Sequence, residues 1–266
     1  MTGARDIPSH HDHGPAPTRA RLFVDAPLGG GESIGLSSGQ AQYLQNVLRL
    51  KAGDPVALFN GTDGEWAGTI AELGKGRASV EVHRLRRQQV AEPDLWLLFA
   101  PIEHARIDYL AQKATELGVS VLQPVITAHT SVARVDVDRL SANAVEAAQQ
   151  TGRLTIPHVR AAVPLQKVLA DWPQSRRLML CDESGSGPPV AAALAVERHA
   201  GGLPWAVMVG PEGGFAASEL DALAKLPFVM PVSLGPRLLR ADTAAVAALA
   251  CWQAALGDWA EATPGS

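Results

Sequence analysis

Two glycine-bearing stretches near the C-terminal end decide the fold: VGPEGGF at residues 209–215 and SLGPRLLRADT at residues 233–243. Each follows a short apolar run typical of a buried strand, at 205–209 and 228–234, and each precedes a helical pattern. A strand that ends in a glycine turn and opens into a helix leaves backbone N–H and C=O groups free at the carboxyl edge of a sheet, where open α/β sheets bind ligands. Either loop alone could be a tight turn, but the pair predicts one ligand pocket built mostly from backbone.

Alternating strand and helix patterns surround these stretches. Further strands are expected at 95–100, 119–126 and 178–181, and helices at 105–117, 142–151, 189–199, 218–225 and 243–256. Such alternation implies a parallel sheet covered by helices on both faces. Residues 93–260 are therefore predicted to form an α/β domain.

The preceding segment, residues 19–90, has the pattern of a small β-barrel. Its β-like runs lie at 21–24, 55–59, 65–70 and 78–82, with one helix expected at 40–50. Asn60-Gly61 and Asp63-Gly64 are typical of a hairpin turn between two of these runs. Residues 1–18 have almost no large apolar side chains and are expected to be a disordered tail. The histidines at 10, 11 and 13 could hold a transition metal only loosely there, so no metal site is predicted.

The composition is that of an ordinary globular protein. Of 266 residues, 47% are hydrophobic and 19% are charged, and the net charge of −4 argues against a generic nucleic-acid binder. No apolar run reaches the roughly 20 residues that span a bilayer, and the first residues lack a signal-peptide core. Cys181 and Cys251 have no motif spacing and are expected to be free buried thiols. These features predict a cytoplasmic protein with no membrane partner.

The glycine loops do not fit the common nucleotide-binding signatures. Residues 210–214 lack the G-x-G-x-x-G spacing, and no Lys-Ser/Thr pair of a P-loop follows them. Phosphate binding is therefore not predicted for the pocket.

The two stretches resemble the signature segments of the RsmE-type methyltransferases, which belong to the SPOUT superfamily of trefoil-knotted RNA methyltransferases. The resemblance extends to residues 112–119 and 146–157, and in the barrel to 21–24 and 47–54. It covers about residues 20–258. It implies a trefoil-knotted SPOUT domain with a mainly parallel sheet at 93–260, a PUA-like RNA-binding barrel at 19–90, and a homodimer.

The resemblance also implies an activity. Family members transfer a methyl group from S-adenosylmethionine to N3 of a uridine in 16S ribosomal RNA, at the family's target position 1498, and assembled 30S subunits are the expected substrate. S-adenosylmethionine carries a sulfonium and an adenine but no phosphate, which agrees with loops that lack a phosphate signature. By resemblance, the residues expected to line the cofactor pocket are Val209, Gly210, Glu212, Gly213, Gly214, Leu234, Gly235, Leu239 and Arg240.

Methylation at N3 requires loss of the N3 proton and stabilisation of the negative charge that develops. Arg240 is the first candidate for stabilising the base or its flanking phosphate, although it could instead pair with Glu212 or Asp242. Glu212 could accept the proton or hold a loop. Thr243 could contribute a hydroxyl or cap the last helix, and Asp242 is an equally good cap.

Basic residues in family-like segments are the candidates for RNA contacts, because arginine suits phosphate. They are Arg19, Arg21, Arg49, Lys113 and Arg153. Lys113 and Glu116 could simply pair with each other at i, i+3. Gln112 and Gln150 could orient a base edge or satisfy buried backbone groups.

Three departures from the family pattern reduce the positive charge on the expected RNA face. Gln42-Tyr43 replaces a histidine pair, Ile102-Glu103-His104 replaces a segment with a lysine, and Thr130 stands where an arginine is usual. Two alternatives therefore remain: an RNA-binding or ribosome-assembly module of the same fold with little catalysis, and a SPOUT methyltransferase with a different RNA target.

Overall fold

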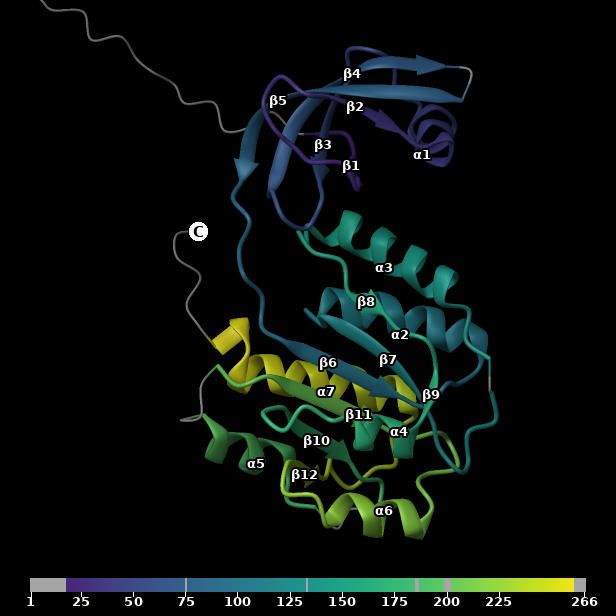
Figure 1. Cartoon of the computed structure of the whole chain (residues 1–266), viewed down its shortest axis with the longest axis vertical. Helices are drawn as coiled ribbons and strands as arrows, with labels where there is room; N and C mark the ends of the chain where they lie inside the picture. The colour runs from purple at the N-terminus through teal and green to yellow at the C-terminus, as the bar shows by residue number, and fades with distance from the viewer. Residues whose placement is uncertain (1–17, 75, 133, 185–186, 199–201, 261–266) are drawn as a thin grey trace, which may run out of the picture. The chain divides into compact units, whose positions relative to one another are not determined.

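The computed structural model describes residues 18–74, 76–132, 134–184, 187–198 and 202–260. The chain divides into two compact units, Met1–Gln89 and Val90–Ser266, which are labelled by element in Figure 1. The predicted tail with its histidines lies outside the described residues, apart from Thr18.

The N-terminal unit is built on a five-stranded sheet of order β1-β3-β4-β5-β2. Its strands are β1 (Arg21–Phe23), β2 (Ser33–Leu36), β3 (Pro55–Phe59), β4 (Glu65–Gly74) and β5 (Arg77–Arg87). β1 pairs with β3 in parallel and the other pairings are antiparallel, so β3 and β4 form the expected hairpin. Apolar side chains from the strands, including Leu22, Val56, Leu58 and Val80, form one buried core.

The single helix expected at 40–50 has a more complex form. α1 (Ser38–Gln42) begins at Ser37, whose hydroxyl accepts the Gln40 N–H in a capping box. A π-helical turn, η1 (Tyr43–Val47), continues it and keeps Leu44 fully buried. Arg49 then takes a left-handed conformation with φ 55°, which ends the turn and brings Leu50 back into the core.

The C-terminal unit contains a seven-stranded sheet in which every pairing is parallel. The order is β12-β10-β11-β6-β7-β8, with β9 also paired to β7. The strands are β6 (Leu95–Phe99), β7 (Val121–Ile126), β8 (His158–Val159), β9 (Val163–Pro164), β10 (Arg177–Cys181), β11 (Trp205–Val209) and β12 (Val229–Val232). The central strands are continuous apolar runs because both of their faces are buried.

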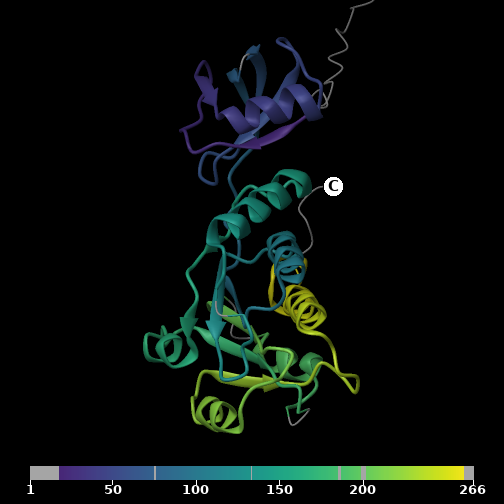
Figure 2. The same ribbon diagram turned by 90° about the vertical axis from the view of Figure 1, so that its right-hand side faces the viewer.

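Helices cover both faces of this sheet, as Figure 2 shows for α2 and α7 on one side and α4 on the other. They are α2 (His104–Glu116), α3 (Val137–Thr151), α4 (Leu165–Ala170), α5 (Val190–Glu197), α6 (Ala217–Ala224) and α7 (Ala241–Leu256), followed by the short η2 (Asp258–Ala260). Alternate residues of β11 point to opposite faces: Val207 packs in the core beneath α2, α5 and α7, and Met208 in the core beneath α4 and α6.

None of the helices in the described part of the chain is both long and apolar enough to cross a membrane. The predicted fold class is confirmed as mixed α/β, with a mainly parallel C-terminal sheet.

Candidate active site

Three loops meet at the carboxyl edge of the C-terminal sheet. Parallel pairing aligns Phe99, Val209, Cys181 and Val232 in one row across β6, β11, β10 and β12. Beyond this row the loops that follow β10, β11 and β12 enclose a cavity of about 780 Å³. Its lining residues are Cys181–Ser184, Val209–Glu212, Gly214, Phe215, Ser233–Ala241 and Ala244. The sequence predicted a pocket at this edge, and the structure places one there.

The loop after β11 turns tightly at its glycines. Gly214 donates its N–H to the Pro211 carbonyl at 2.9 Å and has φ +70°, a conformation that favours glycine. A β-carbon on Gly210 would lie 2.8 Å from the ring of Phe215, which is itself buried. The glycines at 210 and 214 therefore keep this backbone close to its neighbours and to the cavity.

Eight of the nine residues predicted to contact the cofactor line the cavity, and Gly213 is the exception. Gly213 faces the segment after β7, where a β-carbon on it would lie 3.3 Å from Cβ of His129. The family resemblance implied that Gly213 lines the pocket with its neighbours. A tight turn, however, directs successive residues to different sides.

The loop after β10 is a third wall that the sequence did not reveal. Asp182 is 9% exposed, and its carboxylate accepts the Ser184 N–H at 2.9 Å and the Ser184 hydroxyl at 2.5 Å. Glu183 also lines the cavity, and its carboxylate occupies the space that a β-carbon on Gly214 would need. Burial raises the pKa of the neighbouring Cys181 to about 12, with a smaller contribution from Cys251, so this thiol stays protonated at neutral pH. Acidic residues directly after a predicted strand were the available sequence signal.

Arg240 directly precedes the first residue of α7. It occupies the N-cap position, where its carbonyl accepts the Ala244 N–H at 2.8 Å, and its side chain is exposed. Neither Thr243 nor Asp242 caps the helix, and Asp242 accepts the Thr243 N–H instead. Among the described residues no carboxylate lies within ion-pair distance of Arg240, and Glu212 instead pairs with Arg106 at 3.8 Å. Arg240 therefore forms neither of the ion pairs, with Glu212 or with Asp242, that the sequence left open as alternatives to a functional role.

Arg21 belongs to a buried ion cluster in the N-terminal unit. Glu65, whose side chain is 4% exposed, pairs with Arg21, with Arg86 at 3.0 Å and with Arg87 at 2.7 Å. Burial acts to raise the pKa of Glu65, but hydrogen bonds from Arg87 and Arg21 outweigh it and hold that pKa below its usual value. The guanidinium of Arg21 also lies over the ring of Phe59. This placement favours a structural role for Arg21 over contact with RNA.

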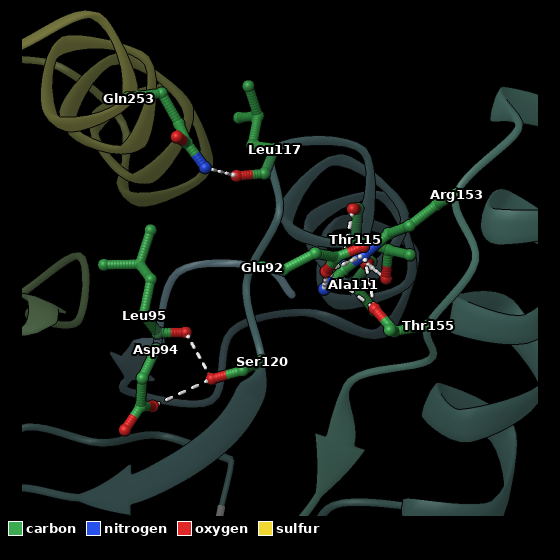
Figure 3. Close-up of polar contacts among 10 residues, drawn as sticks. All are labelled: Glu92, Asp94, Leu95, Ala111, Thr115, Leu117, Ser120, Arg153, Thr155 and Gln253. Atoms are coloured by element: carbon green, nitrogen blue, oxygen red, sulfur yellow. Dashed lines mark hydrogen bonds and ion pairs between the residues drawn. The ribbon is translucent and has the colours of Figure 1, made fainter. Parts of the chain in front are cut away.

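Arg153 is held in the same way inside the C-terminal unit, as Figure 3 shows. Its side chain is 8% exposed, and it donates to Glu92 at 2.6 and 2.9 Å and to the carbonyl of Thr115 at 2.8 Å. Thr155 donates its hydroxyl to the same Glu92 oxygen at 2.6 Å. Arg153 thus ties the end of α2 and the residues after α3 to the segment that enters β6.

The other polar candidates have simpler surroundings. Lys113 pairs with Glu116 at 2.7 Å, as the i, i+3 spacing allowed, and this bond raises the pKa of Lys113. Arg19 is exposed and lies 3.4 Å from Asp54, and Arg49 is exposed at the end of η1. The remaining polar residues of interest have local partners: Gln112 bonds Asn143, Gln150 bonds Glu146, and Thr130 bonds Thr127.

Two family descriptions match the chain. An RNA methyltransferase domain matches residues 90–253, and an RNA methyltransferase PUA domain matches residues 36–82. The first match covers more than half of the chain. It contains all the residues that line the cavity.

Relatives and solved structures agree with these matches. The ribosomal RNA small subunit methyltransferase E of Rickettsia conorii is 32% identical, over 86% of this chain and 93% of the relative. A ribosomal RNA small subunit methyltransferase E from Neisseria gonorrhoeae, solved with S-adenosylmethionine, gives a TM-score of 0.80 at 28% identity, over 90% of this chain and 99% of that one. A methyltransferase from Legionella pneumophila, also solved with this cofactor, gives 0.79 at 29% identity, over 91% and 99%. With its cavity at the expected sheet edge, the chain belongs to the ribosomal RNA small subunit methyltransferase E family.

Proposed function

We propose that this chain transfers the methyl group of S-adenosylmethionine to N3 of a uridine in 16S ribosomal RNA, the family's target position 1498. The observation that carries the proposal is the cavity at the carboxyl ends of β10, β11 and β12. The Neisseria and Legionella structures, whose folds match this one over nine-tenths of the chain, both hold that cofactor. The matched PUA domain supports an RNA substrate.

The residues of the cavity fit S-adenosylmethionine. Its volume of about 780 Å³ is within the range typical of small-molecule sites. The walls come largely from loops, whose backbone N–H and C=O groups can recognise an adenine without a phosphate-binding motif. At Gly235, which has φ +107°, a β-carbon would meet nothing within 4 Å, so this backbone is open on one side. The groups that would hold the cofactor belong to Val209, Gly210, Gly214, Leu234, Gly235 and Leu239.

When bound, the cofactor supplies the methyl group, so the N3–CH₃ bond forms as the S–CH₃ bond breaks. The protein must orient the uridine, take its N3 proton and stabilise the negative charge on the base. Arg240 is suited to the last task because its guanidinium is exposed beside the cavity and has no carboxylate partner among the described residues. It could bind the base itself or its flanking phosphate.

Two carboxylates beside the cavity are candidates for taking the N3 proton. Glu212, the tentative choice from the sequence, is 42% exposed on its side chain and pairs with Arg106, which supports a role in holding the loop. Glu183 lines the same cavity and has no cationic partner within ion-pair distance among the described residues. Glu183 is therefore the stronger candidate for the proton acceptor.

We further propose that the enzyme acts as a homodimer in the cytoplasm, on the assembled 30S subunit. The support for the dimer is the family resemblance. The support for the assembled subunit is the chain's net charge of −4, because an acidic protein gains little from nonspecific attraction to naked RNA. Arg19 and Arg49 are exposed in the N-terminal unit and are the basic candidates best placed to reach phosphate.

The deciding experiment is a methyl-transfer assay on unmodified 30S subunits with labelled S-adenosylmethionine, followed by nuclease digestion and mass spectrometry. We expect N3-methyluridine at one position. Methylation elsewhere would show a different RNA target, and cofactor binding without any transfer to 30S subunits or 16S RNA would contradict the proposed substrate. If the protein neither transferred a methyl group nor bound the cofactor, a non-catalytic RNA-binding module would be favoured. Equal methylation of free 16S RNA would contradict the preference for assembled subunits.

A further inference from the structure

The turn at Pro211–Gly214 is held by the segment that follows β7, which does not line the cavity. His129 places its Nδ1 atom 3.0 Å from the carbonyl oxygen of Gly213 and 3.1 Å from that of Gly214. Both partners are carbonyl oxygens and can only accept, so Nδ1 must carry the hydrogen. One imidazole N–H thus bridges two consecutive carbonyls of the loop that follows β11.

Neighbouring contacts fix the position of His129. Ala128 donates its N–H to Glu219 at 2.9 Å, and the other oxygen of that buried carboxylate accepts the Ala216 N–H at 2.9 Å. Thr130 closes the segment on itself, since its hydroxyl accepts the Thr127 N–H at 2.8 Å. The segment is therefore bonded on both sides of Phe215, to the loop at residues 213–214 and to Glu219 of α6.

The close approach of His129 also explains Gly213. A β-carbon on Gly213 would lie 3.3 Å from Cβ of His129, so even the smallest side chain there would require the histidine or the turn to shift by a few tenths of an ångström. Gly213 does not line the cavity, whereas Pro211, Glu212 and Gly214 do. The absence of a side chain at Gly213 serves the contact with His129.

We infer that His129 is a positioning residue for cofactor binding, which holds the carbonyls of Gly213 and Gly214 so that the residues of the turn that line the cavity keep the shape of the pocket. The inference rests on the proposed function in one respect, namely that this cavity takes S-adenosylmethionine. Holding a loop in its bound conformation before the ligand arrives lowers the conformational cost of binding.

The test compares His129→Ala, which removes the bridging N–H, with His129→Asn, whose amide nitrogen occupies the position of Nδ1 and can donate to the same carbonyls. Ser131→Ala, at an exposed position of the same segment, is the matched control. Two quantities are measured on the full chain: the hydrogen-exchange rate of the Gly214 amide without cofactor, and the dissociation constant of S-adenosylmethionine by calorimetry. Circular dichroism confirms that each variant is folded.

We expect His129→Ala to speed exchange of the Gly214 amide and to weaken cofactor binding about tenfold, the effect of losing about 1.4 kcal/mol of hydrogen bonding. His129→Asn should restore both quantities to within about twofold of the wild type, and Ser131→Ala should change neither. If His129→Ala does not fold, Gly213→Ala replaces it, because its β-carbon presses on His129 and lengthens the two hydrogen bonds while keeping the N–H.

Unchanged cofactor affinity in a folded His129→Ala variant would overturn the inference, whether or not the exchange rate rises. Equal losses in the alanine and asparagine variants would also overturn it, because the donated hydrogen would then be irrelevant. If the wild-type protein binds no S-adenosylmethionine, the proposed function fails instead. The exchange rates still test the contact between His129 and the turn in that case.

Discussion

The carboxylate of Glu183 lies against Gly214, with Oε1 only 1.6 Å from the position that a β-carbon on Gly214 would take. The loop after β10 and the loop after β11 therefore meet at a point that only a glycine leaves open. Gly214 also has φ +70°, so two independent constraints act on one residue at the cavity wall.

Gly214→Ala should consequently displace Glu183 and weaken cofactor binding at least tenfold. The backbone strain alone should lower stability by about 1 kcal/mol. The matched control is Gly202→Ala, since Gly202 has φ +83° but a β-carbon there would meet nothing within 4 Å. Both variants should lose similar stability in urea unfolding, and only Gly214→Ala should lose affinity in calorimetry. Equal affinities would show that Glu183 and the turn do not shape the pocket.

Glu183→Gln removes the carboxylate that we assign to the N3 proton and keeps its size. Turnover should fall by about 10²- to 10⁴-fold at neutral pH, the usual contribution of a general base. The difference in rate between the wild type and Glu183→Gln should shrink as the pH rises, because the uridine then loses its N3 proton to solvent. Single-turnover rates across a pH series measure this, with Asp221→Asn on the exposed face of α6 as the control. A deficit that is constant with pH would argue against proton transfer to Glu183.

Arg240→Ala should reduce methyl transfer without affecting the fold. The side chain is exposed and its backbone, not its guanidinium, caps α7, so stability should change by less than about 0.5 kcal/mol. Loss of one cation that stabilises the developing charge should lower the rate by about 10²- to 10³-fold. Arg198→Ala, at an exposed position after α5, should leave the rate unchanged. A rate for Arg240→Ala equal to that of Arg198→Ala would remove Arg240 from the mechanism.

The ion cluster around Glu65 predicts a pH dependence of stability. The folded-state pKa of Glu65 is held below its usual value, so its contribution is complete above the unfolded-state pKa and is lost as the pH falls through the folded-state pKa. Glu65→Gln should destabilise the N-terminal unit by about 3–5 kcal/mol at neutral pH, because it removes the buried negative charge that Arg21, Arg86 and Arg87 share. Urea unfolding near pH 7 and in the acid range measures this, with the exposed Glu72→Gln as control. A stability difference that persists undiminished in acid would contradict this assignment.

The main strands and helices of the C-terminal unit and the edge of the sheet that holds the site were predictable from the sequence, because they depend on local patterns. The strand expected at 205–209 has the same bounds as β11 in the structure. The glycines expected to end α2 and α3, Gly118 and Gly152, both take the left-handed conformation that ends a helix. Elements with weaker patterns were missed, including β2, α4 and the short β8 and β9. β2 contains a glycine and four residues only, and α4 has six, so neither is long enough to show a period.

The roles of the arginines could not be predicted, because their partners are remote in the chain. Arg21 meets Glu65 across 44 residues, and Arg153 meets Glu92 across 61. Both arginines lie in family-like segments. A sequence alone cannot distinguish an arginine that is free to bind phosphate from one that is already paired with a carboxylate far away in the chain. The loop after β10 was missed for a related reason, since Glu183 reaches the site only through the pairing of β10 with β11.

Arg153 allows the two roles to be separated by experiment. Its guanidinium is almost buried and bonds Glu92 and the carbonyl of Thr115, so Arg153→Ala should destabilise the C-terminal unit by about 3–5 kcal/mol. Arg153→Lys should recover only part of this loss, since lysine cannot make the same forked contacts. Once folded at low temperature, both variants should bind 16S RNA within about twofold of the wild type, with the same dependence on salt. Arg19→Ala is the comparison, because that exposed side chain should matter for RNA and not for stability. A shallower salt dependence for Arg153→Ala than for Arg19→Ala would mean that Arg153 contacts phosphate after all, through a rearrangement that breaks its bond to Glu92.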